Sequence, residues 1–387
     1  MAAASIALPR IMRVGGGASQ EIGAVLQGLG LQRPLIVTDQ FLLSHGQVDR
    51  LKTALESSGI TAAVFAETVP DPTVASVQAG LAALRAGDFD CVLGFGGGSP
   101  IDSAKAIAVL GRHGGAMHDY KAPRQMDQPG LPIIAVPTTA GTGSEATRFT
   151  VITDETTDEK MLCIGLAFLP IAALVDYELT LTKPLRLTAD TGVDALTHAI
   201  EAYVSRRANP FSDSLALAAM KAIAANLRIV CREPDNRPAR EAMMLAATQA
   251  GMAFSNASVA LVHGMSRPIG AFFHVPHGLS NAMLLPVVTA FSAGAALGRY
   301  AECARAMGVA SEHDADEPAV SRLLHELAQL NQDLSVPSPR AYGIDERRWQ
   351  ELLPVMAGQA LASGSPANNP RVPSASEIED LYRQAWG

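Results

Sequence analysis

The chain has few cysteines, no cluster of basic residues and no long apolar run. Its 387 residues include only 4 cysteines, which are far apart and form no CxxC pair. We therefore expect neither a disulfide framework nor a thiolate zinc site. No apolar run reaches the roughly 18 to 20 residues that a membrane helix needs, so no membrane association is expected.

The charge balance narrows the range of partners. The formal net charge is -8 with a pI near 5.6, and lysine and arginine are scattered, which argues against nucleic-acid or anionic-membrane surfaces. A small molecule is the expected partner. The first twenty residues carry two arginines and no acid, a weak similarity to an organelle transit peptide, but they lack a signal-peptide core and cleavage pattern. We expect a cytoplasmic protein.

The length and the hydrophobic pattern predict two domains. In residues 1–182, short apolar runs alternate with helical patterns, which indicates an α/β domain with a parallel sheet. The predicted strands are 34–39, 62–65, 90–95, 131–137 and 172–176, with a hairpin at 149–153 and 160–164. Residues 183–387 read as all-helical, with helices at 187–203, 213–231, 240–255, 292–307, 319–330, 346–362 and 376–386 and a surface loop at 362–373.

Two glycine-rich loops follow predicted strands. In the first, residues 96–105, three glycines allow close approach of a ligand, Ser99 is the expected N-cap, Pro100 the first helical residue and Asp102 the capping-box acid. A helix opened in this way suits a pyrophosphate. The loop matches neither GxGxxG nor a P-loop, and a tight structural turn is the alternative.

The second loop, residues 138–145, also joins small hydroxyl residues and glycines to the end of a buried strand. Ligands of open parallel sheets bind beyond the carboxyl ends of the strands, so two such loops together favour a nucleotide site. Asp39, at the end of the strand 34–39, could accept hydrogen bonds from an adenosine ribose and would repel a 2′-phosphate. It favours NAD over NADP, although an ordinary helix cap is an equal alternative.

A carboxylate and three imidazoles form the strongest pattern. Asp194 and His198 lie four residues apart in a predicted helix, so both should project from one face. His263 and His277 offer two further imidazoles from a separate segment. This donor set suits a divalent transition metal such as Fe(II) or Zn(II), which the ligands alone do not separate.

Several stretches together resemble the iron-containing alcohol dehydrogenases, which have the dehydroquinate-synthase-like fold. They are 96–105, 137–145, 190–203, 251–256, 261–265 and 276–278. The resemblance implies an N-terminal NAD(P)-binding domain and a C-terminal helical metal-binding domain. It implies that Asp194, His198, His263 and His277 bind the metal and that Phe254 lines the substrate pocket, for which Phe149 is a further candidate. The dinucleotide contacts that it implies are Asp39, Gly97, Gly98, Ser99, Asp102, Thr138, Thr139, Thr142 and Lys160.

The chain departs from that family at Arg267. Alcohol dehydrogenases of this type commonly carry a second histidine there, four residues after His263. A fixed positive charge at this position could bind a substrate carboxylate or phosphonate, although an arginine paired with a neighbouring acid is the alternative. His274 could supply the lost imidazole as a proton relay, or it could simply be packed.

The expected function is metal-dependent, NAD-linked interconversion of alcohol and aldehyde, with His277, His274 and Arg267 near the reacting groups. The alternatives are reduction of an anionic substrate (a semialdehyde or an oxo acid such as maleylacetate), a dehydroquinate-synthase-like lyase, and a non-enzymatic metal- or nucleotide-binding protein. The resemblance also implies a homodimer or a higher homo-oligomer. Iron is the expected metal and NAD the expected cofactor.

Overall fold

The computed structural model describes residues 3–387, which divide into two compact units. The N-terminal unit spans Ile6–Thr182, and the helical unit contains Lys183–Gly387. The predicted combination of an α/β region followed by an all-helical region is confirmed.

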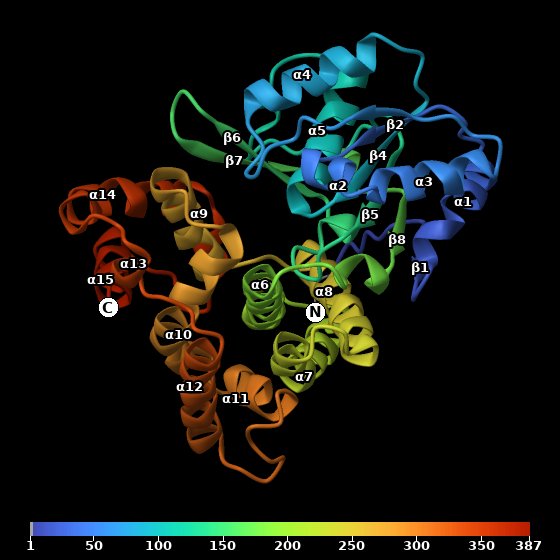
Figure 1. The fold of residues 1–387 in the computed structure, drawn as a ribbon. Helices are drawn as coiled ribbons and strands as arrows, with labels where there is room; N and C mark the ends of the chain where they lie inside the picture. Colours follow the sequence, from blue (N-terminus) through green and yellow to red (C-terminus); the bar gives the residue numbers. More distant parts are fainter. Residues whose placement is uncertain (1–2) are drawn as a thin grey trace. The chain divides into compact units, whose positions relative to one another are not determined.

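A six-stranded parallel sheet forms the centre of the N-terminal unit (Figure 1). Its strand order is β1-β8-β5-β4-β2-β3. The strands are β1 (Ile11–Val14), β2 (Pro34–Val37), β3 (Ala63–Phe65), β4 (Cys91–Gly96), β5 (Ile133–Pro137) and β8 (Ala172–Val175). The predicted hairpin is also present, as β6 (Phe149–Asp154) and β7 (Glu159–Ile164) in antiparallel pairing.

Helices cover both faces of this sheet because its strands are apolar on both sides. Val92 of β4 packs in one core cluster with α4 (Val74–Arg85) and α5 (Gly98–His113). Its neighbour Leu93 packs in the other cluster, with α1 (Ile22–Leu29) and α3 (Gln47–Glu56). Successive side chains of a strand point to opposite faces, so an uninterrupted apolar strand needs helices on both.

The start of α5 differs from the prediction. Gly97 is the N-cap and α5 begins at Gly98, so Ser99 and Pro100 are the second and third residues of the helix. Asp102 does not cap the helix. Its carboxylate accepts hydrogen bonds from Ser144 Oγ at 2.6 Å and from the Val151 amide at 2.9 Å, which ties α5 to the segment after the second loop.

Lys105, also on α5, is fully buried. Its Nζ donates to the carbonyl oxygen of Thr147 at 3.1 Å, to Thr147 Oγ1 at 3.1 Å and to the carbonyl oxygen of Phe149 at 2.7 Å. Burial lowers the pKa of Lys105 to about 8, and the charges of Asp102 and Glu145 oppose that shift. This ammonium therefore joins α5 to the start of β6.

The helical unit contains ten helices in the described residues. They are α6 (Leu185–Val204), α7 (Pro210–Arg232), α8 (Arg237–Asn256), α9 (Leu261–Phe273), α10 (His277–Ala293), α11 (Leu297–Ala306), α12 (Asp316–Asp333), α13 (Pro339–Tyr342), α14 (Glu346–Ala362) and α15 (Ala375–Ala385). The single helix expected at 292–307 is wrong, because α10 ends at Ala293 and a 3-10 turn at Gly294–Ala296 separates it from α11. Prolines inside α9 and α10 obscured both helices in the sequence.

Some of these helices are unusually apolar. By length and composition alone, α7 and the stretch His277–Ala306 could each cross a membrane, and α8 with α9 would be a third candidate bent by 105°. The sequence analysis did not single them out. In the structure α7 packs against α6 and α8, and α10 against α6, α9 and α12, while 33% of the apolar window in α7 and 50% of that in His277–Ala306 are buried.

We expect Lys105→Met to destabilise the N-terminal unit by about 3 kcal/mol, since it leaves buried acceptors and carboxylates without their cation. Urea unfolding followed by circular dichroism measures the change. Lys52→Met is the matched control, because Lys52 is partly exposed on α3 and forms no ion pair within residues 3–387. Equal stability of the two variants would contradict a structural role for Lys105.

Candidate metal centre

Helix α6 contributes two of the four candidate ligands. Asp194 and His198 are one helical turn apart and both are buried, 1% and 4% exposed. Helical geometry places side chains at positions i and i+4 on the same face, so the predicted pairing is found in the structure.

His263 and His277 come from two consecutive helices. His263 is the third residue of α9, and His277 is the first residue of α10, directly after the N-cap Pro276. The short connection between these helices reverses at His274, which has a positive φ of 54°. It thereby brings the start of α10 back toward the start of α9.

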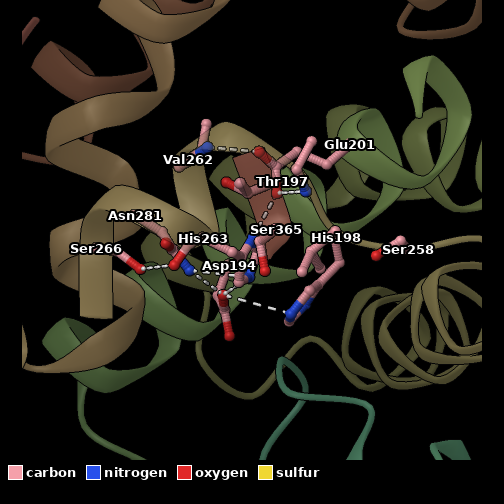
Figure 2. Close-up of polar contacts among 12 residues, drawn as sticks. Asp194, Thr197, His198, Glu201, Ser258, Val262, His263, Ser266, Asn281 and Ser365 are labelled. Carbon is pink, nitrogen blue, oxygen red and sulfur yellow. Dashed lines mark hydrogen bonds and ion pairs between the residues drawn. The ribbon is translucent and has the colours of Figure 1, made fainter. Parts of the chain in front are cut away.

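The four side chains converge on one point. Figure 2 shows three of them, Asp194, His198 and His263. One ligand atom from each lies within 4.8 Å of all the others. From Asp194 Oδ1, the Nε2 atoms of the histidines lie 3.5 Å away for His263, 3.8 Å for His277 and 3.9 Å for His198. His277, with 34% of its side chain exposed, is the member open to solvent.

This geometry fits a divalent ion. Four donors about 2.1 Å from one ion in a tetrahedral arrangement lie about 3.4 Å apart, close to the separations from Asp194 Oδ1. Imidazole nitrogens with one carboxylate oxygen are ligands that iron and zinc accept. The donor set and its spacing therefore agree with a metal centre in the helical unit.

The site strongly favours the ionised carboxylate. Burial alone would raise the pKa of Asp194, but the charges of His198 and His277 and the hydrogen bond from His263 outweigh it and hold the pKa far below its usual range. Burial would lower the pKa of His263, but its contacts with Asp194 and Glu201 raise it. Asp194 is thus an anion that favours a positive charge next to it. That charge can be a protonated histidine ring or a bound metal ion.

Two residues near the cluster were missed by the sequence analysis. Asn281 lies one turn after His277 on α10, and its Nδ2 donates to Asp194 Oδ1 at 2.7 Å. Glu201 lies one turn after His198 on α6 and contacts His263 Nδ1 at 2.7 Å. Both could have been found from helical spacing, because each follows a candidate ligand by three or four residues.

Phe254 and His274, both candidates from the sequence, have different surroundings. Phe254 is buried, and its ring stacks on that of His198 at 4.3 Å between centroids. His274 is exposed and is the C-cap of α9, and within residues 3–387 its ring forms no hydrogen bond or ring contact with the four ligands. A role for His274 as a proton relay stays a prediction.

Arg267 is buried, 8% exposed, and its Nη1 donates to Ser365 Oγ at 2.9 Å. The alternative interpretation, pairing with a neighbouring acid, is not found, since the guanidinium forms no ion pair with any residue in the described range. Burial lowers the pKa of Arg267 to about 10, and the charge of Glu201 opposes that shift.

The segment 362–373 is not simply a surface loop. It contains a 3-10 helix, Ser365–Asn368, in which Ser365 and Pro366 are buried. This helix packs against α9 so closely that a Cβ on Gly264 would lie 2.8 Å from Pro366 Cγ. The hydroxyl that meets Arg267 therefore comes from a segment almost a hundred residues further along the chain.

In the N-terminal unit, the two predicted nucleotide loops lie side by side. β4 pairs with β5 up to Gly96 and Pro137, so the loops leave the same edge of the sheet. A Cβ on Gly98 would lie 2.9 Å from Thr142 Cγ2, and one on Gly97 would lie 3.5 Å from Thr139, so glycine permits this approach. Thr138 is buried, and its amide donates to the carbonyl oxygen of Gly96.

Asp39 lies at the carboxyl end of β2, and Lys160 is paired with the loop that follows the neighbouring strand β3. Asp39 follows β2 and is the N-cap of α2 (Gln40–Ser44), where its Oδ1 accepts the Leu42 amide at 2.8 Å. Lys160 lies on β7 and pairs with Asp71 in the loop after β3, with 2.7 Å between Nζ and Oδ1. The alternative interpretation of Asp39, a helix cap, is thus seen directly.

Comparison with known proteins identifies the family. Residues 9–177 match the iron-containing alcohol dehydrogenases, and residues 188–386 match the C-terminal part of the Fe-containing alcohol dehydrogenase family. The chain is 37% identical to 1,3-propanediol dehydrogenase of Citrobacter freundii over 382 residues, which cover 98% of each chain.

Solved structures agree with this result. A 1,3-propanediol oxidoreductase is 36% identical and superimposes with a TM-score of 0.94 over 99% of this chain and 100% of the other. The sulfoacetaldehyde reductase of Bifidobacterium kashiwanohense, solved with NAD+, is 30% identical with a TM-score of 0.88 over all of both chains. The chain belongs to the iron-containing alcohol dehydrogenase family and is an alcohol dehydrogenase or aldehyde reductase.

Proposed function

We propose that this enzyme interconverts an alcohol and its aldehyde at a divalent ion, iron in the first instance, held by Asp194, His198, His263 and His277. The observation that carries the proposal is the convergence of three imidazole nitrogens on a single oxygen of Asp194. A divalent ion bound there supplies the polarisation that alcohol deprotonation and carbonyl reduction both require.

The protein's own groups hold and shield this position. The ring of Phe254 stacks on His198 and covers it, while His277 remains partly exposed. Substrate would therefore approach from the side of His277. Because the other three ligands are buried, water has little access to the site except along that side, which favours hydride transfer over side reactions.

We propose that NAD binds across the carboxyl edge of the sheet in the N-terminal unit. The main support is the contact between the two loops, Gly97–Ser99 and Thr138–Thr142, at the start of α5. The N-terminus of α5 presents free backbone N–H groups and a partial positive charge, which suit a pyrophosphate. Both carboxylate oxygens of Asp102 already accept hydrogen bonds, from Ser144 and Val151. Asp102 would therefore stabilise the loop and would not bind the cofactor with both oxygens.

A second candidate substrate class is an aldehyde that carries an anionic group. Arg267 supports it, because its buried guanidinium lacks an ion pair within residues 3–387 and lies one helical turn after His263. A structural relative, the sulfoacetaldehyde reductase, is named for a substrate with a sulfonate. A semialdehyde or an oxo acid would present a comparable anion.

The remaining proposals follow the family. We propose that the enzyme acts in the cytoplasm on a small molecule and assembles as a homodimer or larger homo-oligomer, without nucleic-acid or membrane partners. The support is the acidic net charge of -8 and the absence of a basic cluster in the sequence.

The metal assignment predicts the behaviour of ligand variants. His263→Ala and His277→Ala should lose bound iron or zinc and at least about a hundredfold in kcat, while the affinity for NAD stays within about twofold, because the two sites use different residues. Elemental analysis, NADH absorbance with alcohols and NAD titration are the three measurements. A variant that is active without bound metal would refute the assignment. In the unmodified enzyme, net formation of NADH from an alcohol distinguishes a dehydrogenase from a lyase.

Two variants of Asp39 can separate its role as a helix N-cap from the effect of its charge on the choice between NAD and NADP. Asp39→Asn keeps an N-cap acceptor but removes the charge, so kcat/KM with NADP should rise about tenfold at unchanged thermal stability. Asp39→Ala should relax cofactor choice in the same way and also cost about 1 kcal/mol of stability. If Asp39→Asn leaves the NAD to NADP ratio unchanged, Asp39 is only a helix cap.

If the substrate carries an anionic group that binds Arg267, then changing Arg267 should alter the relative kcat/KM of anionic and neutral aldehydes. Arg267→His should lower kcat/KM for succinic semialdehyde about 10- to 100-fold relative to butanal, the loss expected for a charged hydrogen bond. Ser365→Ala is the control, since it removes the hydrogen bond to Arg267 but keeps the charge. An unaltered ranking in Arg267→His would leave neutral substrates as the only proposal.

A further inference from the structure

Glu201 is a buried carboxylate, 3% exposed, that accepts three hydrogen bonds from one short segment (Figure 2). Its Oε2 accepts the Ala260 amide at 2.8 Å and faces His263 Nδ1 at 2.7 Å. Its Oε1 accepts the Val262 amide at 2.6 Å. The same side chain therefore contacts the N-terminus of α9 and one of the four candidate ligands.

These contacts determine which nitrogen of His263 carries the proton. A carboxylate oxygen only accepts hydrogen bonds, so His263 Nδ1 must be the donor in a 2.7 Å contact. In the neutral ring, Nε2 then has the lone pair. Nε2 is the atom that faces Asp194 Oδ1 at 3.5 Å and Asn281 Nδ2 at 3.1 Å.

The two amides fix the position of the carboxylate itself. Ala260 is the N-cap of α9 and Val262 is its second residue, so both amides lack acceptors inside the helix. The N-terminus of α9 also has a partial positive charge that favours an anion. Glu201 of α6 is therefore fixed against the N-terminus of α9, and its contact with Nδ1 fixes the orientation of the His263 ring.

We propose that Glu201 is a positioning residue that holds His263 in the Nδ1–H tautomer and so directs Nε2 to the metal. A carboxylate behind a metal-binding histidine typically changes metal affinity about 10- to 100-fold, through tautomer and ring orientation. The proposal rests on the proposed metal site. It adds a single anion on α6 that supports a ligand on α9.

The simplest test replaces Glu201 by Gln, which keeps the size of the side chain but offers one acceptor in place of two. The NH2 group then faces either the Val262 amide or both the Ala260 amide and His263 Nδ1. We expect Zn2+ affinity, measured by competition with a chromophoric chelator, to fall 10- to 100-fold relative to the unmodified protein. Fe2+ measured anaerobically should show the same loss.

A control variant separates ligand positioning from helix capping. Asn368 holds the same bend between α8 and α9, because its Nδ2 donates to Ser258 Oγ at 2.9 Å and to the carbonyl oxygen of Val259 at 3.3 Å, and it does not touch His263. Asn368→Ala should lower thermal stability but keep Zn2+ affinity within about twofold. If it weakens Zn2+ binding as much as Glu201→Gln, Glu201 is only a structural residue and the proposal fails.

A direct measurement uses the metal-loaded protein. In 15N-histidine-labelled, Zn2+-loaded protein, the nitrogen shifts of His263 should show a protonated Nδ1 and a metal-bound Nε2. Metal bound through Nδ1 in the unmodified protein would overturn the proposal even if Glu201→Gln does not fold. If the unmodified protein binds no metal, the proposed function fails; if it and Glu201→Gln bind Zn2+ equally, only this inference fails.

Discussion

Electrostatic repulsion among buried acceptors is the constraint on which the helical unit depends. The Nε2 atoms of His263, His277 and His198 lie 3.5 to 3.9 Å from Asp194 Oδ1, and of these side chains His277 alone is partly exposed. A buried carboxylate is costly by itself, and lone pairs at these separations repel unless a proton, the amide group of Asn281 or a metal ion lies between them. The side chains must therefore be held from outside until an ion is bound.

That support comes from parts of the chain that are distant in sequence. Helix α9, which carries His263, is fixed at its N-terminus by Glu201 of α6. Further along α9, the buried hydroxyl of Tyr382 in α15 donates to the carbonyl oxygen of Met265 at 2.7 Å. The segment 365–368 packs against Gly264 and binds Arg267. Residues 365 to 382 thus brace the helix that carries one of the four candidate ligands.

The N-terminal unit uses buried charges in a similar way. Asp102 and Lys105 connect α5 with the segment from Ser144 to Val151 through hydrogen bonds to hydroxyls, amides and carbonyl groups. These contacts keep the two glycine-rich loops next to each other. A nucleotide that binds there would meet a surface that is already formed, so little binding energy is lost in ordering it.

The sequence by itself determined the two-part fold, the parallel sheet with its hairpin, and the four candidate metal ligands. Periodicity of 2 and 3.6 residues and spacing of four within one helix are local properties, and they specify which faces are buried and which ligands pair. Only the tertiary structure decided the partners of Glu201, Arg267, Asp102 and Lys105. It also showed that α5 starts at Gly98 rather than Pro100 and that segment 362–373 is partly buried. Those outcomes depend on contacts between residues 40 to 100 positions apart, which no local pattern encodes.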